Sequence, residues 1–253
     1  MYIKFFRGVA ISISLLSFAQ AGITTINDAI DKAGRQRMLS QRMMKNYSMV
    51  GMSMKFNDPL KQLKASSELF ESTLEELIGF SKDKESKDAL KRVKELWVPL
   101  KAKLIAPPDK ERVVELFEEV DKLLEASHKA TNAIALNSKK STGEIINISG
   151  RQRMLSQRLG SLYMLKVWGV GMDDSRLQET IKEFKKAQTK LLAFPKNSKE
   201  IEAGLNAVKK DFMFFEVLGA SKSKKYIPSL IARSSNKITK KMNDVTKLYI
   251  DIK

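Results

Sequence analysis

Apolar residues along most of this chain recur at steps of three and four, which is the spacing of an amphipathic helix. One such stretch comprises Leu60, Leu63, Leu69, Phe70, Leu74, Leu77 and Ile78. No two segments alternate apolar and polar residues as paired strands would. The pattern therefore predicts an all-α fold.

Turn-forming residues divide this pattern into eight predicted helices. In the first half the breaks fall at Asn57-Asp58-Pro59, at residues 79–86 and around Pro107-Pro108, and Asp58 is suited to cap a helix that begins with proline. The predicted helices span about 24–56, 59–79, 84–105, 109–138, 142–171, 174–193, 198–219 and 223–251. Four helices of this length can form an up-down-up-down bundle.

The nonapeptide GRQRMLSQR occurs twice, at Gly34–Arg42 and at Gly150–Arg158. The copies lie 116 residues apart, which is half of the 232 residues after position 21, and Tyr47 and Tyr163 recur at the same offset. We therefore expect two tandem helical units, at 22–137 and 138–253. The junction contains no proline, so a long helix shared by both units fits the sequence, and so does a kink or short loop at residues 139–143.

The first 21 residues have the pattern of a secretory signal peptide. Lys4 and Arg7 precede an apolar run that ends near Leu16, and Ala19-Gln20-Ala21 fits a cleavage site. The run is shorter than the roughly 20 residues that a membrane span requires. We therefore expect residues 1–21 to direct export to the periplasm and to be cleaved, rather than to anchor the chain.

The chain is strongly basic, with a formal net charge of +17, and it contains no cysteine. Most of the excess is lysine spread along the predicted helices, which we interpret as solvated faces; attraction to anionic membranes or acidic partners is the alternative. An exported protein rarely meets nucleic acid, so no nucleic-acid partner is expected. The lack of cysteine excludes disulfides and thiol chemistry.

Residues suited to catalysis or metal binding are scarce. His128 is the single histidine and is interpreted as structural or solvent-facing, and the methionines of the first helix are interpreted as core packing. Paired carboxylates, a nucleophile with a base and a phosphate-binding glycine loop are not evident, and Ser40 and Ser156 have no histidine partner. We expect no enzyme activity, no cofactor and no metal.

The motif segments contain arginines and almost no acid. Residues 32–57 and 145–172 include neither Asp nor Glu, so local salt bridges cannot neutralise these arginines. Helix geometry also sorts them onto two faces. The outer set, Arg35, Arg42, Arg151 and Arg158, is expected to pair with acids of neighbouring helices, such as Glu75, Glu118 or Glu183.

The inner pair, Arg37 and Arg153, lies on the other face, together with Gln41 and Gln157. A guanidinium group presents a fork of donors that matches a small planar oxyanion. The inner pair is therefore our candidate for ligand binding.

The two motif copies, preceded by Ile30-Asp31-Lys32-Ala33 and by Ile146-Asn147-Ile148-Ser149, resemble the signature of the PilJ-type domain. This domain is the N-terminal sensory module of type IV pilus methyl-accepting chemotaxis proteins. The motif is also similar to that of periplasmic nitrate/nitrite sensor histidine kinases. The resemblance directly covers two stretches of about 20 residues, and the helical pattern extends it over most of the chain.

The resemblance implies a four-helix bundle in which the motif helices of two subunits meet and one arginine from each holds a nitrate-like anion. That arginine follows the motif glycine, Gly34 or Gly150, by three residues and is therefore Arg37 or Arg153. Because one chain carries both copies, the two halves can form the pair internally, and dimerisation of whole chains stays open.

Two features depart from the family pattern. An asparagine usually lies three residues before the glycine; Asn147 keeps it, but Asp31 replaces it in the first copy. A carboxylate there weakens anion binding unless Asp31 points away or the ligand is not a simple anion. In addition, no transmembrane helix or kinase core follows the motif, so we expect signalling through a separate membrane receptor or envelope protein.

The sequence thus favours a periplasmic sensory module that binds a small anion. The alternative is a non-catalytic structural or adaptor protein of the cell envelope that keeps the fold without a ligand. In that case the arginines would be satisfied by carboxylates of the protein itself.

Overall fold

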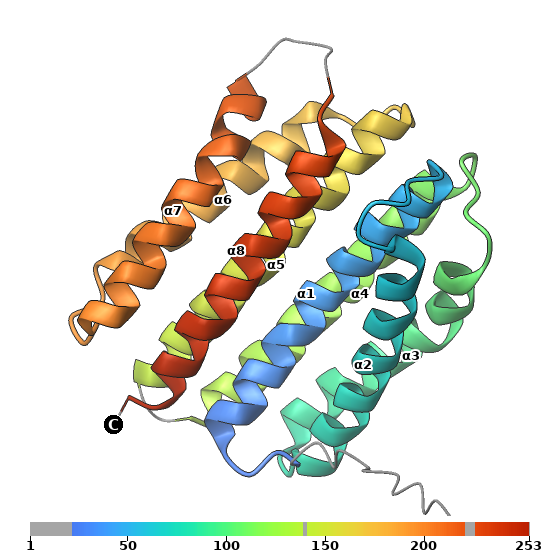
Figure 1. The fold of residues 1–253 in the computed structure, drawn as a ribbon. Coiled ribbons are helices and arrows are strands. Elements are labelled where there is room, and N and C mark those ends of the chain that lie inside the picture. The colour runs from blue at the N-terminus through green and yellow to red at the C-terminus, as the bar shows by residue number, and fades with distance from the viewer. Residues whose placement is uncertain (1–21, 139–140, 221–225, 253) are drawn as a thin grey trace, which may run out of the picture.

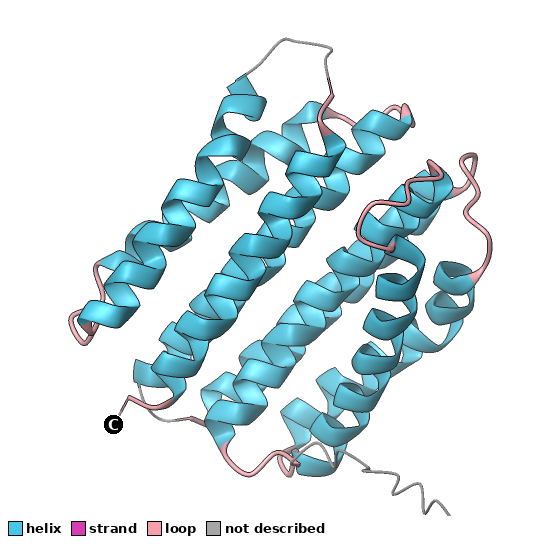
Figure 2. Ribbon diagram, viewed as in Figure 1, coloured by secondary structure: helices cyan, strands magenta, loops and turns pink. Residues whose placement is uncertain are grey.

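The computed structural model describes residues 22–138, 141–220 and 226–252. Every regular secondary-structure element in these ranges is a helix, and none is a strand (Figure 2). The helices are α1 (Ile26–Gly51), α2 (Pro59–Phe80), α3 (Lys84–Ile105), α4 (Val113–Leu136), α5 (Ser141–Trp168), α6 (Asp174–Leu192), α7 (Lys199–Ala220) and α8 (Pro228–Ile250). The predicted all-α fold is confirmed. The predicted signal peptide lies outside the described residues.

The helices form two four-helix bundles that stand side by side (Figure 1). Successive helices run in opposite directions, α1–α4 in one bundle and α5–α8 in the other, so the two motif helices α1 and α5 run in the same direction. These two helices pack against each other in the centre, flanked by α4 and α8. The repeat therefore produces two similar units related by an approximate two-fold axis along the bundle.

The connection between the units reverses the chain. The α4 helix ends at Leu136 and a turn follows at Asn137 and Ser138. The α5 helix then runs antiparallel to α4 (Figure 1). Of the two alternatives for the junction, the structure has the short connection and not a shared helix.

Capping residues explain where several helices begin. Asp58 caps α2, as predicted, because its carboxylate accepts a hydrogen bond from the N–H of Lys61 and Pro59 occupies the first turn. Thr25 and Asp28 form a capping box at the start of α1. The local sequence therefore fixes these two N-termini.

Four predicted helix boundaries were wrong by several residues, namely the C-terminal ends of α1 and α5 and the N-terminal starts of α4 and α8. The α1 helix ends at Gly51 rather than near 56, because Ser53, Asn57 and Asp58 have positive φ angles. The α5 helix ends at Trp168 rather than near 171, because glycines 169 and 171 have φ angles of 70° and 72°.

The fourth helix of each bundle also begins later than expected. The α4 helix begins at Val113 rather than near 109, because the Asp109 carboxylate accepts from the N–H groups of Glu111 and Arg112 and holds a turn. The α8 helix begins at Pro228 rather than near 223, and residues 223–225 of the prediction lie outside the described residues.

The tyrosines at matching positions of the repeat have matching roles. The hydroxyl oxygen of Tyr47 accepts a hydrogen bond from the N–H of Asp109 (2.9 Å), and that of Tyr163 accepts one from the N–H of Ile227 (2.8 Å). Each tyrosine thus ties its motif helix to the chain just before the fourth helix of the same bundle. This contact is a direct structural sign of the repeat.

Apolar side chains fill both bundles. Trp97 packs on Phe70 with ring centroids 4.3 Å apart, and in the second bundle Phe184 stacks on Phe212 at 4.0 Å. The methionines at 38, 43, 44 and 49 are buried in the core, as predicted. Among the described helices, none combines the length and apolarity needed to cross a membrane.

Candidate functional site

The backbones of the two motif helices come close to each other at the two motif glycines. A Cβ atom added to Gly34 would lie 3.7 Å from the Cα of Gly150, and one added to Gly150 would lie 3.6 Å from the Cα of Gly34. A Cβ at either position would thus already touch the facing backbone, so a side chain larger than alanine has little room there. The glycines allow α1 and α5 to cross in contact.

Both inner arginines reach this crossing. The NH2 atoms of Arg37 and Arg153 lie 3.2 and 3.3 Å from the position that a Cβ of Gly34 would occupy. Arg37 NH2 donates a hydrogen bond to the backbone oxygen of Asn147, and Arg153 NH2 donates one to that of Asp31, both at 3.2 Å. Each inner arginine thus binds the backbone of the opposite half.

The NH1 atoms of the two arginines have different partners. Arg37 NH1 donates to Nδ1 of His128 in α4 (3.0 Å), whereas Arg153 NH1 donates to Oδ1 of Asn243 in α8 (3.0 Å) and lies 2.7 Å from Oδ1 of Asp31. Within the described residues Arg37 forms no ion pair. The approximate two-fold symmetry of the crossing is therefore broken by charge.

Both guanidinium groups are buried. The side chains of Arg37 and Arg153 are 0% and 1% exposed, and the Nε atom of each has no hydrogen-bond partner in the described part of the chain. Burial, followed by the charges of Arg153 and Arg151, lowers the pKa of Arg37 to about 9. Burial also lowers the pKa of Arg153, although Asp31 opposes this shift. The crossing therefore holds two buried cations at neutral pH.

Asp31 faces the site and does not point away from it. Its Oδ2 accepts a hydrogen bond from Arg35 NH2 at 3.1 Å, while its Oδ1 pairs with Arg153 by charge without the alignment of a hydrogen bond. Burial alone would raise the pKa of Asp31, but the charges of Arg153 and Arg35 outweigh it and lower the pKa. Asp31 is therefore ionised and occupies part of the binding capacity of Arg153.

The outer arginines mostly bind protein groups, as expected. Arg151 pairs with Glu183 of α6 (3.1 Å), which confirms one of the predicted acids. Arg158 binds Asp121 of α4 through both terminal nitrogens, with NH2 2.8 Å from Oδ2.

The remaining outer contacts correct the prediction. Arg35 pairs with Asp31 of its own helix, because this acid lies immediately before the acid-free stretch and one turn before Arg35. Arg42 donates to the neutral Oε1 of Gln62 (3.1 Å). Two acids named as partners are engaged elsewhere: Glu75 with Lys94 and Glu118 with Arg176.

Gln41 and Gln157 lie one turn beyond the inner arginines and contact the flanking helices. Gln41 Nε2 donates to Oδ1 of Asp121 in α4 (3.3 Å), and Gln157 Nε2 donates to Oγ1 of Thr239 in α8 (2.7 Å). The structure therefore places the six residues Asp31, Gly34, Arg37, Asn147, Gly150 and Arg153 at the crossing and leaves these two glutamines outside it.

Other motif residues have structural contacts. Gln36 Nε2 donates to the backbone oxygen of Phe70 in α2 (2.9 Å), and Gln152 Nε2 donates to that of Phe184 in α6 (3.2 Å). Each glutamine thus ties its motif helix to the second helix of its own bundle. Part of the repeated nonapeptide therefore serves packing.

A cleft of about 350 Å³ leads to Arg37 from the side of α4 and α6. It is lined by Arg37, Asp121, Leu124, Glu125, His128, Arg151, Met154, Arg158 and Glu183. Burial, followed by the charges of Arg37 and Arg151, lowers the pKa of His128 to about 4, so its ring is neutral at pH 7. This contact of His128 was not predicted from the sequence, because no local pattern links residue 128 to residue 37.

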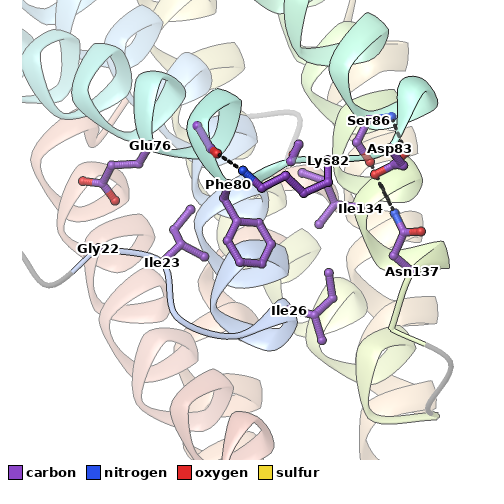
Figure 3. Close-up of a pocket in the computed structure, with 12 residues that line it drawn as sticks. Gly22, Ile23, Ile26, Glu76, Phe80, Lys82, Asp83, Ser86, Ile134 and Asn137 are labelled. Carbon is purple, nitrogen blue, oxygen red and sulfur yellow. Dashed lines mark hydrogen bonds between the residues drawn. The ribbon is translucent and has the colours of Figure 1, made fainter.

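A second cavity, of about 630 Å³, lies at the end of the first bundle, between the start of α1, the α2–α3 connection and the end of α4 (Figure 3). Ile23, Ile26 and Phe80 give it an apolar lining. None of the nonapeptide residues lines it. This cavity is therefore separate from the arginine crossing.

Comparison with known proteins identifies the family. The sequence profile of the type IV pili methyl-accepting chemotaxis transducer N-terminal domain, PilJ, matches residues 24–138 and 134–211. No curated protein and no solved structure matches the chain. The family is one of sensory, non-catalytic domains. The profile covers more than half of the chain, so this protein belongs to the PilJ family of chemotaxis-transducer N-terminal domains.

Proposed function

We propose that this protein is an exported sensory module that binds a small oxyanion, such as nitrate or nitrite, between Arg37 and Arg153. In this proposal the two halves of one chain form the arginine pair that the family resemblance implies for two subunits. Occupancy is passed to a separate membrane receptor or envelope partner, because the described helices cannot cross a membrane themselves.

The convergence of two buried guanidinium groups on one crossing carries this proposal. Only one carboxylate, that of Asp31, lies among them in the described residues, so the crossing keeps a positive excess. Both Nε–H groups lack partners in this part of the chain, and a buried donor without a partner is costly. An oxyanion would satisfy them, with about 1.5–3 kcal/mol for each charge-assisted hydrogen bond.

Asp31 sets the affinity in this proposal. Its Oδ1 pairs with Arg153 without hydrogen-bond alignment, while Arg35 holds Oδ2. An anion that approaches through the cleft at Arg37 can take the place of Oδ1 at Arg153, and Asp31 stays bound to Arg35. Competition with an internal carboxylate makes binding weaker than at a site with neutral asparagine in both halves.

The ion pair between Asp31 and Arg153 also favours the second candidate, an envelope adaptor without a ligand. In that case Asp31, His128 and Asn243 are the permanent partners of the inner arginines. The two functions differ in whether any anion binds at the crossing.

A thermal-shift titration separates them. Purified protein is heated with nitrate, nitrite or chloride at matched ionic strength. Ligand at 100 times its Kd should add about 2.7 kcal/mol of stability, which raises the melting temperature by about 5–10 °C for a chain of this size. Arg37→Gln and Arg153→Gln should remove the shift, whereas Arg92→Gln, at an exposed surface ion pair, should keep it. No shift with nitrate or nitrite beyond that with chloride would favour the adaptor.

A further inference from the structure

A polar cleft of about 330 Å³ lies between α1, α2, α5 and α8, on the side of the molecule away from α4. It is lined by Arg42, Asn57, Gln62, Gln157, Asn236, Thr239, Lys240 and Asn243. None of these eight residues is acidic, and neither inner arginine lines the cleft. Its volume suits a small molecule.

This cleft is the counterpart of the one at Arg37, with a different charge. Gln157 binds Asn236 as Gln41 binds Asp121, and both pairs lie at 3.3 Å. In the first bundle Asp121 and Glu125 line the cleft, where Asp121 binds Arg158 and Glu183 pairs with Arg151. In the second bundle Asn236 and Lys240 line the corresponding cleft, so no acid among its described lining residues compensates the positive charge.

The two asparagines present donors to the cleft. Oδ1 of Asn236 accepts a hydrogen bond from Lys45 Nζ (2.7 Å), and Oδ1 of Asn243 accepts one from Arg153 NH1 (3.0 Å). Because these donors fix the orientation of both amides, the Nδ2 groups are left for other partners. Asn236 and Asn243 therefore add neutral donors beside the charged ones.

Two cations line the same cleft. Arg42 donates through NH2 to Gln62, and its Nε is buried without a hydrogen-bond partner in the described residues. Lys240 is exposed and forms no ion pair in that part of the chain. The cleft is thus rich in donors and positive charge, which is the chemistry of an anion site.

Gln157 contributes one acceptor. Its Nε2 faces Thr239, Asn236 and the backbone oxygen of Ser235. Its Oε1 is buried and has no partner within the described residues. A buried amide oxygen without a donor calls for one from elsewhere.

We propose that this cleft binds a small hydroxycarboxylate. The carboxylate groups bind Arg42 and Lys240, with Asn236 and Asn243 as further donors, and a hydroxyl group donates to Oε1 of Gln157. An amino acid is disfavoured because no acidic side chain lines the cleft to receive its ammonium group. This second site goes beyond the anion site at the arginine crossing and does not depend on it.

Isothermal titration calorimetry with L-malate and with succinate tests the proposal. The two probes differ by one hydroxyl group, and we expect malate to bind about tenfold more tightly, because succinate leaves Gln157 Oε1 without a donor. Failure of malate to bind at millimolar concentration would overturn the proposal, and equal binding of both probes would overturn the role of Gln157.

Three variants locate the site. Asn236→Asp introduces the acid that the first bundle has, gives Lys45 a carboxylate partner and should abolish malate binding without loss of the fold. Lys240→Ala should weaken binding several-fold, and Lys237→Ala, an exposed lysine of α8 that does not line the cleft, should leave it unchanged. Unchanged binding by Asn236→Asp would place malate elsewhere.

The variant Arg37→Gln separates this proposal from the proposed function. This variant should lose the increase in melting temperature with nitrate and should still bind malate. Loss of malate binding in Arg37→Gln with a retained fold would show that malate uses the arginine crossing, and would overturn the second site.

Discussion

The carboxylate oxygen Oδ1 of Asp31 in α1 lies 2.7 Å from NH1 of Arg153 in α5. At the matching position of the second half, Asn147 offers Arg37 only its backbone oxygen. One half of the crossing thus supplies its own counter-ion and the other does not. A single difference between the two copies therefore makes the two arginines electrostatically unequal.

Asp31→Asn should destabilise the fold and strengthen anion binding. Loss of the carboxylate leaves Arg153 and Arg35 without a charged partner, and breaking a buried pair in this way costs about 3–5 kcal/mol. Urea denaturation measures this loss, and nitrate should stabilise the variant more than the parent protein. Asp88→Asn, which removes an exposed partner of Lys84, is the control and should change stability by less than about 1 kcal/mol. A fully stable Asp31→Asn variant would show that the ion pair contributes nothing.

Gly34→Ala should destabilise the protein, although alanine favours helices. A Cβ at Gly34 would lie 3.2 and 3.3 Å from the NH2 atoms of two confined arginines, so the guanidinium groups must move. We expect a net loss of about 1–2 kcal/mol in denaturant titrations. Gly79→Ala is the matched control, because a Cβ there meets no atom within 4 Å, and it should gain up to about 1 kcal/mol from helix propensity. A gain in both variants would contradict the close crossing of α1 and α5.

Local features of the sequence were sufficient for most of the fold. Apolar spacing located the eight helices of the described residues, and Asp58-Pro59 located the start of α2. The ends that were wrong depend on backbone angles at Ser53 and Gly169, which composition does not reveal. Tertiary contacts such as the hydrogen bond from Asp109 to Tyr47 also act on these ends.

The site was predictable only in part. Helix geometry separated Arg37 from Arg35, and the structure places the first at the crossing and the second on Asp31. The orientation of Asp31 could not be predicted, because it depends on the distance between two helices that are 116 positions apart in the sequence. His128 was missed for the same reason: its contact with Arg37 joins α4 to α1 and has no local signature.

Because the pKa of His128 is lowered in the folded protein, the free energy of unfolding should fall as the pH is lowered. Its pKa is about 4 in the folded protein and 6.5 in an ordinary environment, so between these values the unfolded chain binds more protons. The free energy of unfolding therefore rises with pH across this window. The contribution of His128 is fully present above about pH 6.5 and is lost as the pH falls through 4.

Replacing this histidine tests the effect. His128→Gln should reduce the difference in unfolding free energy between pH 7 and pH 4.5 by about 1–2 kcal/mol, a discounted value because the ring is partly exposed. Asp31 does not interfere, since its lowered pKa places its titration below this window. An unchanged pH profile in the variant would rule out this role for His128.

The buried charge of Lys45 should lower the free energy of unfolding at neutral pH. Its side chain is 0% exposed, and among the described residues its Nζ donates only to the neutral groups of Ser235 (3.1 Å) and Asn236 (2.7 Å). Methionine has a similar shape and no charge to bury. Lys45→Met should therefore raise the free energy of unfolding at pH 7, by about 1–3 kcal/mol.

The gain from Lys45→Met should shrink at alkaline pH. Burial, followed by the charge of Arg42, lowers the pKa of Lys45 well below 10.5, so between the folded and unfolded values the unfolded chain binds more protons. Stability of the parent protein therefore rises with pH in this range. The lowered pKa of Arg37 also makes stability rise with pH, but it does so equally in the parent and in Lys45→Met, so this effect cancels when the two are compared. Denaturant titrations at pH 7 and pH 9.5, with Lys237→Met as an exposed control, measure the difference. A variant less stable than its parent at both pH values would mean that the two hydrogen bonds of Lys45 outweigh the cost of burying it.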